Sequence, residues 1–306
     1  VLITGSAASL GYQTACQILA HPGWHVLVAA RTHAQAAKAA ARLSIDTGNL
    51  HVHPVGCDLG DLMSIRGAVE VVQQLLAAGD LPPLRAIVGN AGVQTTDVQQ
   101  RTSDGYELTF GTNVIGHFAL LRDLLDELSS PARIIMVGSG THWGDFRHNL
   151  GLVPAPLWRP TFDLARPAST GDAGSLHAGR VAYATSKLAV VYLVHELSRR
   201  LPVGATAYTY DPGLMPGTGL ARQAGRVESF VWRRVLPMLR VLPDVSSPVA
   251  SARHLARLII EDEGTPTGAY FALGRAVSSS PASYDPSREA ELWQTLTRLV
   301  DFDTTV

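Results

Sequence analysis

The sequence has few cysteines and no long apolar run. Only two of its 306 residues are cysteine, Cys16 and Cys57, and both lie in apolar contexts. They suggest no disulfide framework, so we expect a reducing compartment, the cytoplasm. No apolar stretch reaches the ~18 residues that a transmembrane helix needs. No signal peptide is evident either, and we expect no integral membrane segment.

An excess of charge of one sign is also missing. The 26 acidic residues nearly balance the 25 basic ones, and the net charge is -1. Nucleic acids and anionic membranes attract strongly basic surfaces, so the composition argues against both as partners. With 46% hydrophobic residues, the chain has enough apolar material for a large core.

Short apolar segments alternate with amphipathic ones along the chain. Strands are predicted near residues 1–4, 24–30, 50–55, 84–89, 132–137, 205–210 and 269–273. Helices are predicted near residues 12–20, 33–43, 62–78, 106–128, 179–201, 247–261 and 288–300. This alternation indicates an α/β fold with a mostly parallel sheet covered by helices on both faces. We expect one doubly wound Rossmann domain over residues 1–306, with seven strands.

Two segments interrupt this alternation, and both follow the carboxyl ends of strands, where such sheets bind ligands. Residues 140–179 are rich in Gly, Pro, His and Trp, and residues 214–244 contain an apolar stripe at 230–242. The stripe has three interpretations: packing on the body, a lid over an apolar substrate, or contact with a membrane surface. The histidines of the first segment, His142, His148 and His177, match no zinc spacing, so we expect no metal site.

A loop of small residues joins the first strand to the first helix. Gly5, Ser6, Ser9, Leu10 and Gly11 lie in this loop, where a backbone can approach a pyrophosphate closely. The N–H groups that open the helix, and its dipole, would bind that anion. The loop therefore predicts a dinucleotide site.

The residues after the second, third and fourth strands refine this prediction. An NAD site carries an acid after the second strand, but Arg31 stands there, and it would pair with the 2′-phosphate of NADP(H). After the third strand come Asp58 and Leu59, and the carboxylate could accept from the adenine amino group. Asn90, Ala91 and Gly92 follow the fourth strand; small residues allow close packing on a cofactor, and Asn90 could tie the central strands together.

Tyr183 and Lys187 are four residues apart in a segment predicted to be helical, so their side chains would share one face. A nearby ammonium favours phenolate, which would lower the tyrosine pKa towards working pH. Such a tyrosine can exchange a proton with a substrate oxygen. The pair predicts acid–base chemistry.

The glycine loop, Asn90-Ala91-Gly92, Asn113, Ser139 and the Tyr183/Lys187 pair occur in an order that resembles the short-chain dehydrogenase/reductase family. The resemblance covers essentially the whole chain. Within the family, residues 104–118 and 211–220 and the long loop after Ser139 are most similar to protochlorophyllide reductases and retinol dehydrogenase-type enzymes.

The resemblance implies roles for individual residues. The family tetrad falls on Asn113, Ser139, Tyr183 and Lys187. Tyr183 would be the general acid/base; Lys187 would lower its pKa and hold the nicotinamide ribose. Ser139 would donate to the substrate carbonyl oxygen, and Asn113 would hold a water linking Lys187 to solvent.

The resemblance also extends the cofactor site. Pro212 and Gly213 would flank the nicotinamide, and Thr218 would bind its carboxamide. The full predicted cofactor set is Gly5, Ser6, Ser9, Leu10, Gly11, Arg31, Asp58, Leu59, Asn90, Ala91, Gly92, Tyr183, Lys187, Pro212, Gly213 and Thr218.

Three features depart from the family pattern. Ser9 stands where the loop usually has its second glycine. Thr218 lies one residue later than usual after Pro-Gly, and Ser139 and Tyr183 are 44 positions apart (183 minus 139). Protochlorophyllide reductases also carry cysteines near their pigment, whereas Cys16 and Cys57 belong to the cofactor half here, which argues against light-driven pigment reduction.

We therefore expect an NADP(H)-dependent oxidoreductase that acts on a carbonyl/alcohol group of a fairly large apolar substrate, working as a ketone or aldehyde reductase. Two alternatives stay open: an NADP-binding sensor without turnover, and a retinol or lipid dehydrogenase at a membrane surface. By resemblance, a homodimer would pair through the helices containing Asn113 and Tyr183.

Overall fold

The computed structural model describes residues 1–306 except 150, 152, 169–174, 216–245, 262–263 and 302–306. Its strands are β1 (Leu2–Thr4), β2 (Val26–Ala30), β3 (Val52–Gly56), β4 (Leu84–Gly89), β5 (Leu128–Val137), β6 (Ala205–Asp211), β7 (Tyr270–Ala272) and β8 (Arg275–Val277). They form one sheet in the order β3-β2-β1-β4-β5-β6-β7-β8. All neighbours are parallel except β7 and β8.

The longer helices are α1 (Ser9–Leu19), α2 (His33–Thr47), α3 (Leu62–Ala77), α5 (Gly116–Leu124), α8 (Leu176–Arg200), α10 (Pro248–Ile260) and α11 (Pro286–Asp301). Short helical pieces are α4 (Leu108–Phe110), η1 (Gly111–Ile115), η2 (Leu125–Glu127), η3 (Gly140–Trp143), α6 (Phe146–Asn149), α7 (Thr161–Leu164) and η8 (Pro281–Ser283). These bounds confirm the doubly wound α/β prediction.

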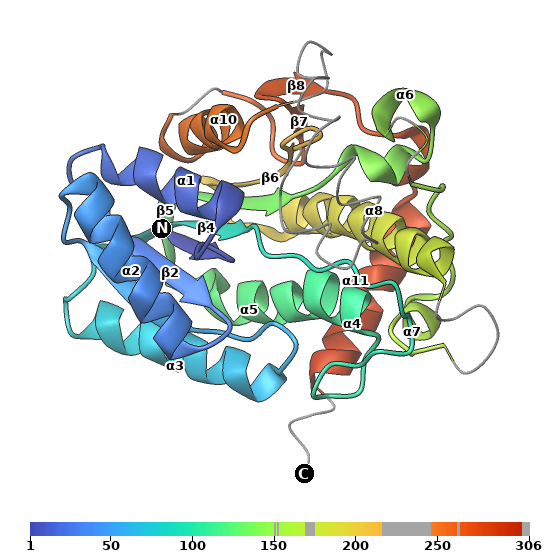
Figure 1. Cartoon of the computed structure of the whole chain (residues 1–306), viewed down its shortest axis with the longest axis horizontal. Coiled ribbons are helices and arrows are strands. Elements are labelled where there is room, and N and C mark those ends of the chain that lie inside the picture. The colour runs from blue at the N-terminus through green and yellow to red at the C-terminus, as the bar shows by residue number, and fades with distance from the viewer. Residues whose placement is uncertain (150, 152, 169–174, 216–245, 262–263, 302–306) are drawn as a thin grey trace.

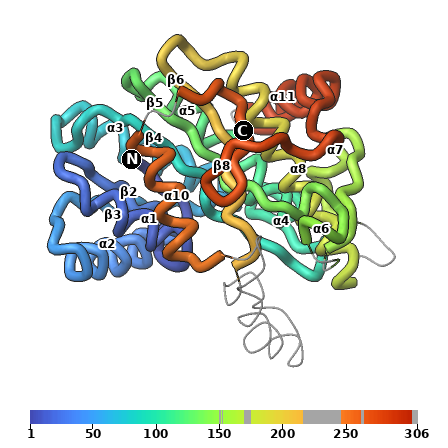
Figure 2. Tube along the Cα trace, turned by 90° about the horizontal axis from the view of Figure 1, so that it is seen from above, coloured from blue at the N-terminus to red at the C-terminus, as the bar shows by residue number. Residues whose placement is uncertain are grey.

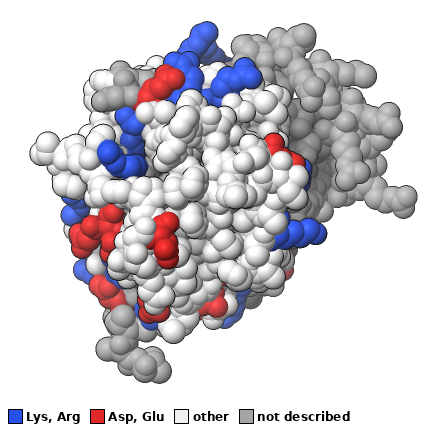
Figure 3. All heavy atoms as spheres, turned by 90° about the vertical axis from the view of Figure 1, so that its left-hand side faces the viewer, with Lys and Arg blue, Asp and Glu red and all other residues white. Residues whose placement is uncertain are grey.

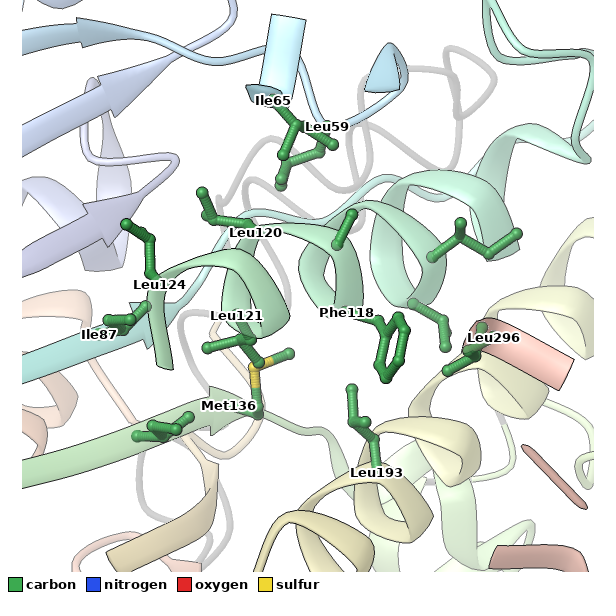
Figure 4. Packing of buried hydrophobic residues seen from close by; sticks show 14 of the residues in the cluster. Leu59, Ile65, Ile87, Phe118, Leu120, Leu121, Leu124, Met136, Leu193 and Leu296 are labelled. Atoms are coloured by element: carbon green, nitrogen blue, oxygen red, sulfur yellow. The ribbon is translucent and has the colours of Figure 1, made fainter. Parts of the chain in front are cut away.

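The helices lie in layers on the two faces of the sheet (Figures 1 and 2). Helices α1, α2 and α10 pack on one face, where their apolar residues form one buried cluster with the strands. Helices α3, α5 and α8 pack on the other face, and α11 lies outside α8. In Figure 4, Phe118 and Leu121 of α5 lie among Met136 of β5, Leu193 of α8 and Leu296 of α11.

Among the described residues, eight strands form the sheet, rather than the seven predicted. The additional strand, β8, pairs antiparallel with β7, and Ala272 lies opposite Arg275. Leu273 and Gly274 form the two-residue turn, with φ values of 51° and 80°. Two successive left-handed residues are what a tight hairpin of this length requires. All three β8 residues are exposed, so their sequence carries no apolar pattern.

The long helix predicted at 106–128 is not continuous. A π-helical turn, η1, interrupts it and places Asn113 at the middle of its five residues. Single π turns inside α-helices often occur at functional sites. The segment 140–179 folds into η3, α6, α7 and the start of α8, while all of the 230–242 stripe lies outside the described residues.

Candidate active site

The predicted site residues within the described range all lie at the carboxyl edge of the sheet. The loop 5–11 follows β1, Arg31 follows β2, and Asp58 follows β3. Asn90 follows β4, and Ser139 comes two residues after the end of β5. Pro212 and Gly213 follow β6, and Thr218 lies outside the described residues. The connections diverge between β1 and β4, and this divergence is where open α/β sheets bind ligands.

The turn after β1 has no room for larger residues at its glycines. Gly5 has φ +64°, and a Cβ there would lie 2.9 Å from the Cα of Ala91. A Cβ on Gly11 would lie 2.6 Å from Nδ2 of Asn90. The N-cap residue of α1 is Ala8, whose side chain accepts no hydrogen bond. The backbone N–H groups in the first turn of α1 are therefore not capped by this residue.

The other loop residues divide by exposure. The Ser6 hydroxyl donates to the Ile3 carbonyl at 2.9 Å and is fully buried, which leaves only its backbone for a ligand. Leu10 and Leu59 are buried too. Ser9 is exposed with φ +51°, so a serine occupies the left-handed backbone that the family's usual glycine would adopt freely.

Asn90 ties β1 to β4, as predicted. Its Nδ2 donates to the carbonyls of Thr4 at 2.8 Å and Gly5 at 3.3 Å. The backbone N–H groups of Asn90 and Ala91 both donate to Thr4 Oγ1 at 3.0 Å. Thr4 Oγ1 also lies 3.0 Å from Nε2 of the buried His117, whose Nδ1 is 3.0 Å from the Asn113 carbonyl. The sequence did not predict this connection between the loop and Asn113.

Asn113 is held firmly by its neighbours. Its Oδ1 accepts from Val93 N at 2.8 Å, and its Nδ2 donates to Val93 O and to Ser186 Oγ, each at 3.0 Å. Ser186 comes from α8, so Asn113 joins η1 to the helix that carries the tyrosine and the lysine.

Tyr183, Lys187 and Ser139 come together at the amino-terminal half of α8. The hydroxyls of Tyr183 and Ser139 share a hydrogen bond. Lys187 Nζ lies 5.7 Å from the centre of the Tyr183 ring and donates to the Val137 carbonyl at 2.8 Å. A Cβ on Gly92 would lie 3.7 Å from Lys187 Nζ, which places this residue beside the ammonium. The four residues of the predicted tetrad thus belong to one connected cluster.

The predicted lowering of the Tyr183 pKa is wrong for this structure. Burial raises the pKa of Tyr183 above its usual value, the hydrogen bond from Ser139 opposes the rise, and the charge of Asp211 adds to it. Burial is the largest cause of the rise, because a phenolate in a low-dielectric interior loses its hydration. Burial also lowers the pKa of Lys187 to about 8, although Asp211 opposes that shift.

Asp211 is a buried carboxylate beside this cluster whose role sequence reasoning missed. Its Oδ1 accepts from Gly213 N at 2.9 Å, and its Oδ2 accepts from the Tyr270 hydroxyl at 2.8 Å. A Cβ on Gly140 would lie 3.3 Å from the same Oδ2. The sequence signal was an acid directly before Pro212-Gly213; its partner Tyr270 is 59 residues away and could not be identified without the fold.

The other residues that the sequence singled out are exposed or make local contacts of their own. Arg31 is exposed, and among the described residues no acid pairs with it. Asp58 Oδ1 accepts from Gly60 N at 3.0 Å. His177 is exposed, and His148 pairs with Asp145 at 2.8 Å. Within the described ranges, no three His, Cys, Asp or Glu side chains form a group suited to a metal ion.

A pocket of about 400 Å³ opens at the opposite, amino-terminal edge of the sheet. Val1, Trp24, Pro82 and Arg133 are among its lining residues, and none of them belongs to the tetrad. It lies away from the chemistry described above.

Comparison with known proteins bears on this arrangement. The model of the short chain dehydrogenase family matches residues 1–146. Human retinol dehydrogenase 13 is 31% identical over 99% of this chain and 85% of its own length. The chain belongs to the short-chain dehydrogenase/reductase family.

Three further proteins are similar to this chain over most of its length. Protochlorophyllide reductase of Chlamydomonas reinhardtii is 31% identical over 98% of this chain and 77% of its own length. A solved structure of an uncharacterized protein from Mycobacterium paratuberculosis is 26% identical, with a TM-score of 0.64 over 98% of this chain and 92% of its own. The landomycin C-6 ketoreductase, solved with NADP and rabelomycin, has 23% identity and a TM-score of 0.59 over 89% of this chain and 94% of its own, a likeness of fold.

In the part of the chain that the structure describes, no helix is both long enough and apolar enough to cross a membrane. Figure 3 shows one face of the molecule, on which charged side chains of both signs lie around a largely uncharged centre. They do not gather into a basic stripe on this face.

Proposed function

We propose that this oxidoreductase uses NADP(H) to transfer a hydride to the carbonyl carbon of a fairly large apolar ketone or aldehyde. The observation that carries the proposal is the hydrogen bond between Ser139 and a buried Tyr183, with the Lys187 ammonium beside the ring. Two hydroxyls that meet in this way can bind one substrate oxygen together.

The raised pKa of Tyr183 supports reduction as the direction. Burial keeps the phenol protonated at neutral pH, so it holds a proton to give away. When a hydride reaches a carbonyl carbon, the oxygen becomes an alkoxide, a stronger base than phenolate. Tyr183 is thus a suitable general acid, while the Ser139 hydroxyl stabilises the negative charge that develops on the oxygen.

The residues present fit a dinucleotide. Gly5 and Gly11 leave no space for side chains against Asn90 and Ala91, and the uncapped opening of α1 offers N–H groups to a pyrophosphate. When bound, NADPH supplies the hydride, and the chain supplies position and charge. Lys187 is the natural partner for ribose hydroxyls, because it is buried beside Gly92 and Tyr183.

Arg31 supports NADP(H) over NAD(H). It is exposed at the end of β2, without an acidic partner among the described residues, and could meet a 2′-phosphate there. A carboxylate that would accept from a free 2′-hydroxyl is absent at positions 30–32.

The names of two relatives support an apolar substrate. Human retinol dehydrogenase 13 and human polyprenol dehydrogenase, the latter 33% identical over 70% of this chain and 60% of its own length, are named for long hydrocarbon alcohols. We therefore propose the same class of substrate, an extended apolar alcohol or its carbonyl form.

The test is the oxidation of NADPH and NADH, followed by nicotinamide absorbance, with a panel of bulky ketones, aldehydes and quinones. We expect turnover that prefers NADPH. Tyr183→Phe should lower kcat by at least about 10²-fold, because it removes the proton donor, while NADPH binding stays within a few-fold. Arg31→Asp should reverse the cofactor preference without abolishing turnover.

The outcomes separate the alternatives. Turnover that survives in Tyr183→Phe would contradict the proposed mechanism. Binding of NADPH without any turnover would favour the sensor, and binding of neither cofactor would contradict the assignment of the loop.

A further inference from the structure

We propose that His142 is a positioning residue that fixes Ser139 against Tyr183, and that residues 279–283 hold it in place. This inference rests on the proposed function, because Ser139 is assigned there as the group that binds the substrate oxygen. His142 lies in η3, at the start of the segment between Ser139 and Tyr183.

The hydrogen bonds of the imidazole ring define its tautomer. Nε2 lies 3.3 Å from the backbone nitrogen of Ser280 and 3.0 Å from Ser279 Oγ. A backbone N–H can only donate, so Nε2 accepts and carries no proton. The proton is then on Nδ1, which donates to the Ser139 carbonyl at 2.7 Å. Each ring nitrogen therefore has a defined partner.

The surroundings keep the ring neutral and fixed. His142 is only 1% exposed, and its ring centre lies 5.1 Å from that of Tyr270 and 5.8 Å from that of Trp143. Burial lowers the pKa of His142 to about 4, so the form with an accepting Nε2 predominates at neutral pH. Tyr270 in turn donates to Asp211, beside Gly213.

The segment that holds Nε2 is itself attached to α8. Ser283 Oγ lies 2.7 Å from both Ser279 Oγ and the Ser280 carbonyl, and Ser279 N donates to the Tyr284 hydroxyl at 3.0 Å. The Tyr192 hydroxyl donates to the Ala282 carbonyl at 2.6 Å.

These contacts form a closed circuit. Tyr192 belongs to α8, nine residues after Tyr183 (192 minus 183). The circuit runs from α8 through residues 279–283 to His142, then to Ser139, and back to α8 through the Ser139–Tyr183 hydrogen bond. The long insertion after Ser139 is therefore anchored at its first turn to the helix that carries the general acid.

The expected consequence is a fixed distance between the two hydroxyls. Ser139 is the N-cap of η3, and within that turn its Oγ accepts from Thr141 N at 3.3 Å, a long bond. The hydrogen bond from His142 Nδ1 to the Ser139 carbonyl is shorter and joins two neutral groups. It fixes the position at which the turn begins. A misplacement of about 1 Å at a reacting centre can cost roughly 10²-fold in rate.

The experiment is a double-mutant cycle. His142→Phe keeps a ring but removes both hydrogen bonds, and His142→Asn keeps an N–H donor near the position of Nδ1. We expect His142→Phe to lower kcat by about 10–100-fold, with KM for NADPH nearly unchanged, and His142→Asn to recover much of the loss. In a Ser139→Ala background, His142→Phe should cause no further loss.

Two outcomes overturn the inference. An equal loss of kcat in the Ser139→Ala background would mean that His142 does not act through Ser139. Unchanged hydrogen–deuterium exchange of residues 139–143 in His142→Phe would mean that the ring does not order this turn, and this readout is independent of turnover. If His142→Phe fails to fold, Ser279→Ala replaces it in the same cycle with a smaller expected effect. An inactive wild-type protein would contradict the proposed function alone.

Discussion

Ser9 is a residue whose backbone conformation conflicts with its side chain. A non-glycine residue in the left-handed region is strained by roughly 1 kcal/mol, and Ser9 has φ +51° at the first position of α1. The sequence identified it as a departure from the family's glycine, but only the backbone shows that the glycine conformation is kept.

Ser9→Gly should therefore stabilise the protein by about 1 kcal/mol, less the entropy that glycine adds to the unfolded chain. The free energy of unfolding in urea measures the change. Ala7→Gly is the matched control, since Ala7 has no left-handed backbone and should lose stability. A loss of stability in Ser9→Gly as well would contradict the inference that the backbone of Ser9 is strained.

Asp211 places a negative charge where Tyr183 and Lys187 both respond to it. Its charge raises the pKa of each group. Asp211→Asn should lower both pKa values, so that the phenol and the ammonium lose their protons at lower pH. The pKa of Lys187 is about 8, within the range of the measurement, so the fall in kcat that follows the loss of its charge should begin at lower pH in Asp211→Asn.

The measurement is the pH profile of kcat between pH 6 and 10. We expect the ratio of kcat at pH 9.5 to kcat at pH 7 to fall at least about threefold in Asp211→Asn. Asp163→Asn removes an exposed acid on α7 and should leave the profile unchanged. Superimposable profiles for Asp211→Asn and wild type would contradict the electrostatic role.

At the scale of elements, α8 is buried on all sides over its central turns. Every residue from Leu188 to Leu197 is buried, because the sheet lies on one side and α11 on the other. Figure 4 shows Leu193 and Leu296 facing the same core as Phe118. A helix that is apolar on all sides must be buried by other elements of the fold, and α11 buries the outer side of α8.

A buried ionic contact holds α11 against α8. Glu289 of α11 is 2% exposed; its Oε1 lies 2.7 Å from His195 Nδ1, and its Oε2 accepts from Arg199 at 2.6 Å. Glu289→Ala should cost about 2–3 kcal/mol of unfolding free energy, because two donors on α8 lose their acceptor.

Arg298→Ala is the matched control for that change. Arg298 is an exposed cation on the same helix that forms no ion pair with the described residues, so its loss should cost less than about 1 kcal/mol. Urea unfolding of both variants gives the comparison. Equal losses in the two would contradict the idea that Glu289 clamps α11 to α8.

The sequence predicted the repeating elements well, because their patterns are local. The strand 84–89 matches β4, and the segment 62–78 nearly matches α3. The π turn at Asn113 could not be predicted, since it depends on contacts with Val93 and Ser186 across the fold. The tetrad could be named because its order along the chain is specific, whereas His142 and Asp211 gain their partners only through tertiary contacts.

At the scale of the whole molecule, the packing of α11 bears on association. The predicted homodimer would use the helices containing Asn113 and Tyr183, but α11 covers the outer side of α8 and contacts Phe118 of α5 through Trp293, with ring centres 5.1 Å apart. The homodimer therefore stays a prediction, and a partner that approached the outer side of α8 would meet α11 there.

Acid should destabilise the whole fold. His117 and His142 are each 1% exposed, and burial lowers the pKa of each to about 4, against 6.5 when unfolded. Between these values the unfolded chain binds more protons, so stability falls as pH decreases from 6.5 to 4. The loss should reach about 3 kcal/mol for each histidine.

Urea unfolding at several pH values tests this expectation. His142→Asn removes one of the two titrating groups, and its stability should fall less steeply over the same range. A free energy of unfolding that stays constant from pH 6.5 to pH 4 in the wild type would contradict the neutral burial of these rings.

The cover over α8 also has a consequence in time. Synthesis adds residues in order, and 86 positions separate Arg200 from Pro286 (286 minus 200). At about 5–20 residues per second, roughly 4–17 s pass between the synthesis of Arg200 and that of Pro286. Before then, α11 cannot cover the apolar outer side of α8. During that interval the nascent chain already contains Tyr183 and Lys187, but the apolar outer side of α8 is exposed to solvent. A ribosome that stops before α11 would release a product prone to aggregation, so α11 also protects the helix that carries the chemistry.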